Sequence, residues 1–174
     1  MKKTTILACC GLLALAACHN SAQDPTRDQL AATIDSAEAP LIEATQLSNV
    51  DKAQGNQIIS LYLQFANTFP DDTMSAYYLH RAAQVATGLD QIDSMASYYD
   101  RVIENYPDYA KLDECYYEKG IALDNAGRKD EARKAYKDFL DEYPDHFLAK
   151  DISTALRLLD MSDEMLIKML SEKK

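Results

Sequence analysis

The chain has 174 residues, of which 28 are acidic and 18 are Lys or Arg, so its formal net charge at pH 7 is −10. Such a charge repels phosphate backbones and anionic headgroups, which argues against nucleic acid as a partner. The length is sufficient for one domain with its own apolar core, without disulfides or metals to hold it together.

The first 17 residues have the pattern of a secretion signal. Two lysines precede the apolar run of residues 6–17, which ends in small residues. Twelve residues are too few to span a bilayer, which takes about 20. Cleavage after residue 17 would leave 157 residues with a net charge of −12, and only Cys18 and Cys115 of the four cysteines. That number excludes a framework of disulfides.

Leu15-Ala16-Ala17-Cys18 ends this run and resembles the lipobox of bacterial lipoproteins. The resemblance implies that Cys18 is acylated, becomes the first residue and anchors the chain in the bilayer, since two acyl chains anchor stably. The alternative is an ordinary signal peptide followed by a coincidental cysteine. In proteobacterial lipoproteins an aspartate in the next position retains the protein in the inner membrane. His19 stands there instead, which indicates the outer membrane, with the domain facing the periplasm.

Residues 18–26 are predicted to be the lipidated cysteine and a flexible tether, because the stretch is polar and rich in turn formers. Residues 27–174 are predicted to form one helical domain. Its first helix is expected over about 27–49, where Pro40 interrupts the pattern and allows a kink.

Three apolar runs then end in the same pattern, an aromatic residue followed by Pro-Asp, at a spacing of 37 residues. The prolines are Pro70, Pro107 and Pro144. Apolar residues before each proline follow the spacing of one helix face, and Tyr62, Tyr99 and Tyr136 hold one equivalent position. Proline lacks an N–H donor and clashes with the preceding turn, so each helix must end there. The aspartate after each proline is expected to cap the next helix.

Each of the last two runs has a partner helix before it, predicted over 74–88 and 112–127. These helices end at Gly88 and Gly127, as expected for a glycine just past a helix end. Gly120 lies on an apolar face, where the missing side chain permits close approach. A fixed period of helical hairpins indicates a stacked array, because one hairpin cannot bury its own apolar face.

The third unit resembles the tetratricopeptide repeat. Its residues at that family's positions are Tyr116, Gly120, Leu123, Ala132, Tyr136 and Pro144. The second unit is more degenerate, and its residues are Leu79, Ala83, Ala86, Met95, Tyr99 and Pro107. The resemblance spans about 40–172. It implies an all-α fold, a right-handed α-solenoid of antiparallel helical hairpins, with about three repeats and a pair of C-terminal capping helices over 146–173.

The sequence contains no pattern that is typical of catalysis or of cofactor binding. With five glycines it has no glycine-rich phosphate loop. His19, His80 and His146 are isolated and have no ligand partner four residues on, so we expect no metal site. Cys115 lies on an apolar helix face and is expected to be a small core residue. We therefore expect no enzyme, no cofactor and no small-molecule substrate.

In tetratricopeptide arrays, the first helix of each pair lines a concave groove that binds peptides or protein segments. Carried over to this chain, the partner-binding residues are Tyr77, His80, Arg81, Gln84, Glu114, Tyr117, Glu118, Ile121, Asp124 and Asn125. Tyrosine suits interfaces because it joins apolar area to a polar tip. The alternative is that these are ordinary solvated positions of a helix.

Together, the lipobox and the repeats predict a membrane-tethered scaffold of the bacterial cell envelope that binds another envelope protein or a peptide segment of it. A second hypothesis is a structural lipoprotein that associates with itself and has no client groove. A third, a catalytic role in wall metabolism, would need convergent titratable groups, which the sequence does not indicate.

Overall fold

The computed structural model describes residues 25–43, 51–162, 164–165, 168 and 171, and this part of the chain is all helical. Its helices are α1 (Arg27–Glu43), α2 (Lys52–Thr68), α3 (Thr73–Gly88), α4 (Ile92–Asn105), α5 (Leu112–Asn125), α6 (Lys129–Glu142) and α7 (Ala149–Leu159). None of these described helices is both long enough and apolar enough to cross a bilayer.

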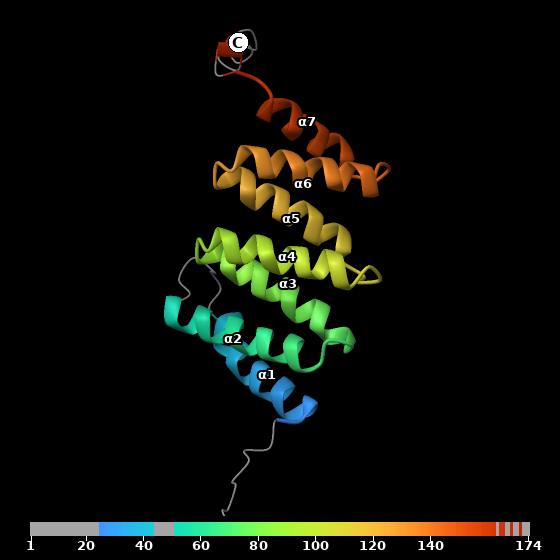
Figure 1. The fold of residues 1–174 in the computed structure, drawn as a ribbon. Coiled ribbons are helices and arrows are strands. Elements are labelled where there is room, and N and C mark those ends of the chain that lie inside the picture. The colour runs from blue at the N-terminus through green and yellow to red at the C-terminus, as the bar shows by residue number, and fades with distance from the viewer. Residues whose placement is uncertain (1–24, 44–50, 163, 166–167, 169–170, 172–174) are drawn as a thin grey trace, which may run out of the picture.

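The helices form a solenoid, as the 37-residue period predicts. Each helix packs against the next along the chain, and Figure 1 shows the stack advancing in one direction from α1 to α7. The hairpins α3–α4 and α5–α6 are the two middle layers of this stack. The predicted fold class, an all-α solenoid of helical hairpins, is confirmed. The signal sequence, Cys18 and most of the last predicted helix lie outside the described residues, as do residues 44–49 of the first predicted helix.

The three Pro-Asp junctions have one backbone conformation. The residues before the prolines, Phe69, Tyr106 and Tyr143, have φ of −127, −131 and −128° and ψ of 60, 63 and 58°. Each donates its backbone N–H to the carbonyl four residues earlier, at 2.8 to 2.9 Å. Each helix therefore completes its last turn just before the proline. This confirms the prediction that Pro70, Pro107 and Pro144 mark the helix ends.

The prediction that the aspartate after each proline caps the next helix is wrong. At the first junction the cap is Asp72, the second residue after the proline, whose carboxylate accepts from the Met74 N–H at 2.8 Å. At the next two junctions a turn intervenes, and α5 and α7 begin after Lys111 and Leu148, which make no side-chain cap. The longer connections move the helix start away from the aspartate.

The apolar core runs along the axis of the stack. The repeated tyrosines Tyr62, Tyr99 and Tyr136 are at most 1% exposed, which confirms that they are equivalent core positions. Gly120 packs against the Tyr136 ring so closely that an added Cβ would lie 2.7 Å from two ring carbons. Cys115 is fully buried, as predicted, and burial raises the pKa of its thiol, which disfavours the reactive thiolate.

Two equivalent turns end α3 and α5, and a different residue type holds the left-handed position in each. Gly127 follows α5 with a φ of 73°, the left-handed conformation predicted for it. In the preceding unit the left-handed residue is Asp90, with a φ of 60°, and not Gly88. Asp90 and Gly127 are 37 residues apart, so the backbone turn repeats although the glycine does not. The helix ends at Gly88 as predicted, but the left-handed turn residue is Asp90, two positions later.

Candidate functional site

The residues predicted to line a groove lie on α3 and α5, the first helices of the two middle hairpins. We call this surface the first-helix face. The half-exposed members are Tyr77, Arg81, Gln84, Glu114, Tyr117, Glu118, Ile121 and Asp124, while Asn125 is exposed. Helical spacing places these side chains on one side of each helix, and the stacking of α4 between α3 and α5 sets the two rows in register.

His80 departs from the prediction that it is displayed on this face, since the residue is only 3% exposed. Its Nδ1 lies 3.1 Å from the Tyr109 hydroxyl and its Nε2 lies 2.9 Å from Oε2 of Glu118. Both ring nitrogens find partners between α3 and the following hairpin. These contacts hold the ring in the space between the two repeats. A buried polar ring with both nitrogens bonded fixes the relative position of the two repeats.

Glu118 is the acceptor at the centre of this network. Its Oε2 accepts from the Tyr99 hydroxyl at 2.7 Å, and Nε2 of Gln84 lies 3.1 Å from both carboxylate oxygens. We call His80, Gln84, Tyr99, Tyr109 and Glu118 the polar cluster. Burial tends to raise the pKa of Glu118, but the hydrogen bonds from its three donors outweigh this and hold the pKa below its ordinary value of 4.5.

An ionised Glu118 fixes the protons of its neighbours. A carboxylate only accepts, so Nε2 of a neutral His80 carries the ring proton, and Nδ1 accepts from Tyr109. Burial, together with nearby carboxylates, raises the pKa values of Tyr99 and Tyr109, which keeps both hydroxyls protonated as donors. The Nε2 atoms of Gln84 and His80 lie 3.2 Å apart, and both direct their N–H groups to the Glu118 carboxylate.

Glu118 thus has a structural role that the sequence did not reveal. Sequence reasoning placed it on the face as a carboxylate for a partner, and its side chain is 30% exposed on that side. The same carboxylate holds donors from α3 and α4. The spacing of the two residues in the sequence could have indicated this contact. His80 and Glu118 are 38 residues apart, one more than the period, so stacked helices bring them side by side.

The same position carries the opposite charge one layer earlier. Arg81 is the counterpart of Glu118, 37 residues before it, and its Nε lies 3.8 Å from Oε1 of Glu38 on α1. The Tyr62 hydroxyl also donates to Glu38, as its counterpart Tyr99 donates to Glu118. Nη1 of Arg81 donates to Oε1 of Gln84 at 3.0 Å, which links this pair to the polar cluster. The face is therefore braced by side-chain contacts across two layers.

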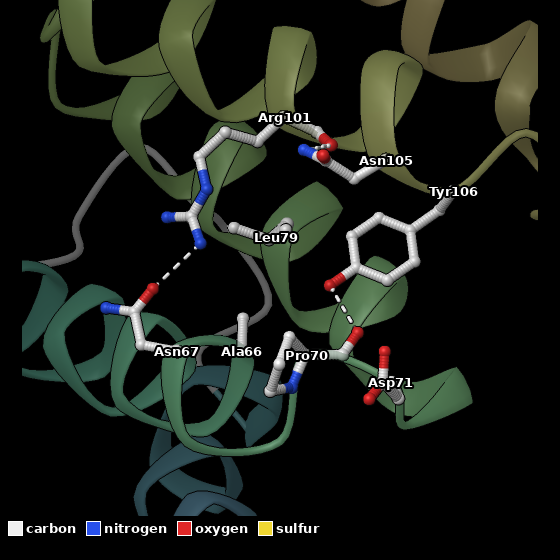
Figure 2. A pocket seen from close by; sticks show the side chains of 8 residues that line it. All are labelled: Ala66, Asn67, Pro70, Asp71, Leu79, Arg101, Asn105 and Tyr106. Carbon is white, nitrogen blue, oxygen red and sulfur yellow. Dashed lines mark hydrogen bonds between the residues drawn. The ribbon is translucent and has the colours of Figure 1, made fainter.

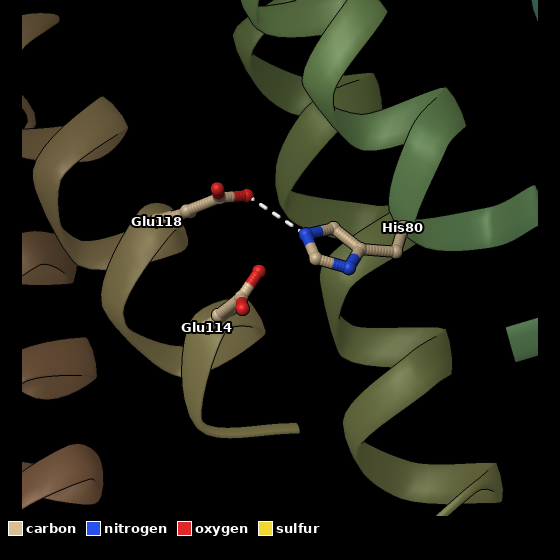
Figure 3. A group of neighbouring side chains, drawn as sticks. All are labelled: His80, Glu114 and Glu118. Atoms are coloured by element: carbon tan, nitrogen blue, oxygen red, sulfur yellow. Dashed lines mark hydrogen bonds and ion pairs between the residues drawn. The ribbon is translucent and has the colours of Figure 1, made fainter. Parts of the chain in front are cut away.

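Glu114 stands beside the polar cluster on the same side of α5. Its side chain is 45% exposed and pairs with Lys111 at 3.0 Å. Carboxylate oxygens of Glu114 and Glu118 and a nitrogen of His80 all lie within 4.8 Å of one another, and Figure 3 shows the three side chains converging. Sequence reasoning placed His80 and both glutamates on the face, but it did not predict that the three side chains converge.

A surface pocket of about 450 Å³ lies on the other side of the stack, between α2 and α4. Figure 2 shows that Arg101 reaches across it, and its Nη2 donates to Oδ1 of Asn67 at 2.8 Å. The Tyr106 hydroxyl donates to the Pro70 carbonyl at 2.9 Å and closes one side. The hydrogen bonds join consecutive hairpins, so the pocket is explained by the packing of the junctions.

Comparison with known families agrees with this architecture. The tetratricopeptide repeat model matches residues 77–109 and 114–146, which hold most of α3–α4 and most of α5–α6. The two matches begin 37 residues apart, which confirms the period and both units. No curated protein matches the chain. The chain thus contains tetratricopeptide repeats, which are typical of protein–protein interaction scaffolds and are typically non-enzymatic.

Proposed function

We propose that this protein is a membrane-tethered lipoprotein of the bacterial cell envelope that binds a segment of another envelope protein on its first-helix face. The observation that carries the proposal is the pair of matched tetratricopeptide repeats, whose first helices each present half-exposed side chains on one side. Repeats of this kind are scaffolds in which the surface, and not a catalytic group, has the function.

The side chains on this face suit an interface. Tyr77 and Tyr117 are half-exposed and offer aromatic area with a polar tip, which is the composition of interface hot spots. Glu114 and Asp124 add carboxylates that would orient a basic partner. The polar cluster fixes α3 against α5, so binding would order few side chains of the scaffold, and that favours affinity.

The tether rests on the sequence alone. Leu15-Ala16-Ala17-Cys18 supports acylation of Cys18, and residues 19–26 provide a polar connection to the domain. The test is Cys18→Ser in cells fed with a labelled fatty acid. Loss of label and release of the protein from the membrane fraction are the expected results. Label retained on the serine variant would overturn this part of the proposal.

The test of the face uses two matched tyrosines. Tyr117 on α5 and Tyr98 on α4 are both half-exposed, but only Tyr117 belongs to the first-helix face. After crosslinking in cells, the partner recovered with the native chain should be lost at least about tenfold with Tyr117→Ala, since hot spots contribute about 2 kcal/mol or more. Tyr98→Ala should recover it normally. Equal recovery with both variants, each with native helical circular dichroism, would show that the face is not used.

Self-association is the second candidate, and one observation favours it. Phe147, in the connection to α7, is 82% exposed, and Met165 is 56% exposed at the same end of the described stack. Exposed apolar side chains at the end of a solenoid are suited to end-to-end contact. This candidate predicts a mass that rises with concentration and falls back to the monomer on Phe147→Ser. A concentration-independent monomer mass would exclude it.

A further inference from the structure

We propose that His80, Glu114 and Glu118 form a binding site for a divalent metal ion of the zinc type. The three side chains come from two consecutive repeats, with the histidine on α3 and both glutamates on α5 (Figure 3). One imidazole and two carboxylates are a ligand set that Zn²⁺ accepts, and two carboxylates match its charge. The inference does not depend on the scaffold function.

The distances require little rearrangement. Bonds from zinc to nitrogen and oxygen of about 2.0–2.2 Å place neighbouring ligand atoms roughly 3.0–3.5 Å apart. Nε2 of His80 and Oε2 of Glu118 are already 2.9 Å apart. All three ligand atoms lie within 4.8 Å of one another, so Glu114 is the group that must approach. Glu114 is half-exposed and one helical turn from Glu118 on the same face, and its carboxylate must leave Lys111, 3.0 Å away, to approach the other two ligands.

The polar groups around the proposed ligands already hold two of them by hydrogen bonds. Tyr99 and Gln84 hold the carboxylate of Glu118, and Tyr109 holds the far nitrogen of the His80 ring. Such partners orient metal ligands in proteins and strengthen binding. They also make the site rigid on the side of His80 and Glu118, while Glu114 stays adjustable on the open side.

Metal binding should change which nitrogen of the His80 ring carries the proton, and this change can be measured. In the polar cluster Nε2 of a neutral His80 donates to Glu118, so that Nε2 carries the ring proton. A metal ion on Nε2 takes the place of that proton, which moves to Nδ1. The hydroxyl of Tyr109 then changes from donor to acceptor and keeps its hydrogen bond. The number of protons on the neutral ring stays the same, and only the tautomer changes.

The experiment is a zinc titration of the full chain, with ¹⁵N-labelled histidine, followed by nuclear magnetic resonance. The expected result is a saturable change at His80 with one equivalent of Zn²⁺, in which the protonated nitrogen moves from Nε2 to Nδ1. Reading the signal at His80 itself separates this site from Cys9, Cys10, Cys18 and His19, which offer zinc other ligands. Zinc that leaves the His80 tautomer unchanged would overturn the proposal.

Two variants complete the design. Glu114→Gln removes a half-exposed ligand outside the polar cluster, so that the fold is kept, and it should weaken zinc binding at His80 at least tenfold. The matched control is His146→Gln. His146 pairs with Asp113 at 3.1 Å, but within the described residues no third ligand joins that pair. The control should bind zinc at His80 as the native chain does. Unchanged affinity in Glu114→Gln would contradict the assignment.

Discussion

The interface of hairpin α3–α4 with α5 and the interface of hairpin α5–α6 with α7 are built on one backbone plan but hold different chemistry. The buried tyrosine is retained at both, as Tyr99 and Tyr136. The other members of the polar cluster change with the 37-residue step. His80 becomes Tyr117, Gln84 becomes Ile121, Tyr109 becomes His146 and Glu118 becomes Ala155.

The comparison shows that the residues that hold the fold recur in each repeat, while the polar residues between repeats differ. Large apolar and aromatic residues at equivalent positions fix the helices in both layers. The polar cluster is added at one interface, where every donor must find an acceptor, since an unpaired buried polar group is costly. At the second interface the counterpart of Glu118 is Ala155, which offers no acceptor, and the Tyr136 hydroxyl instead donates to Asp124 of α5, within its own hairpin, at 3.1 Å. Substitutions at the two interfaces should therefore lower the free energy of unfolding by different amounts.

The largest effect is expected at the buried tyrosine position that both interfaces retain, tested here at Tyr136. Tyr136 is fully buried and Gly120 packs on its ring. Tyr136→Ala should lower the free energy of unfolding by about 3–5 kcal/mol, because it leaves a cavity in the core. Urea denaturation followed by circular dichroism measures this. An unchanged midpoint would mean that the tyrosine does not hold the repeat together.

The next largest change in unfolding free energy is expected when Glu118, the acceptor of the polar cluster, is removed. Glu118→Ala leaves His80, Tyr99 and Gln84 without their common acceptor and should cost about 2–3 kcal/mol. Asp124→Ala, which removes the acceptor of the Tyr136 hydroxyl within the hairpin α5–α6, should cost about 1 kcal/mol. Both are measured by urea denaturation. Equal costs would show that the shared acceptor between repeats contributes no more than the acceptor of a single tyrosine within a hairpin.

Acid should affect the first interface through Glu118. Its pKa is lower in the folded chain than its ordinary value of 4.5, so it contributes stability that is complete above about pH 4.5 and is lost as the pH falls through the folded pKa. Glu118→Gln keeps the shape but cannot titrate. The difference in unfolding free energy between the native chain and this variant should therefore shrink below about pH 4.5. A difference that is constant from pH 7 to pH 3 would contradict this.

The smallest effect concerns the two equivalent turns. Asp90 has a left-handed φ that glycine adopts without strain, so Asp90→Gly should stabilise the chain by about 0.5 kcal/mol. Gly127→Ala introduces the same strain at the equivalent place and should destabilise it by about 1 kcal/mol. No atom would crowd the new Cβ at residue 127, so backbone strain alone is tested there. Thermal melting of both variants gives the answer, and shifts of the same sign would refute the equivalence.

Much of the fold could be predicted from the sequence because its signals are local. Helical spacing of apolar residues and the prolines at 70, 107 and 144 act within one hairpin and set where its helices end. The helix starts were less predictable, because the turn after Tyr106 moves the start of α5 beyond Asp108. A helix-face pattern shows which residues share a surface. It does not show which side chains meet between repeats, and His80 finds its partners 29 and 38 residues away.

The central claim is that the first-helix face binds a protein partner, and site-specific photocrosslinking in cells tests it most directly. A photoreactive amino acid at Tyr117 should give a discrete product of higher mass. The same amino acid at Lys134, whose side chain on α6 is 76% exposed, should not give that product. A product that forms equally from both positions, or from neither, would contradict the claim.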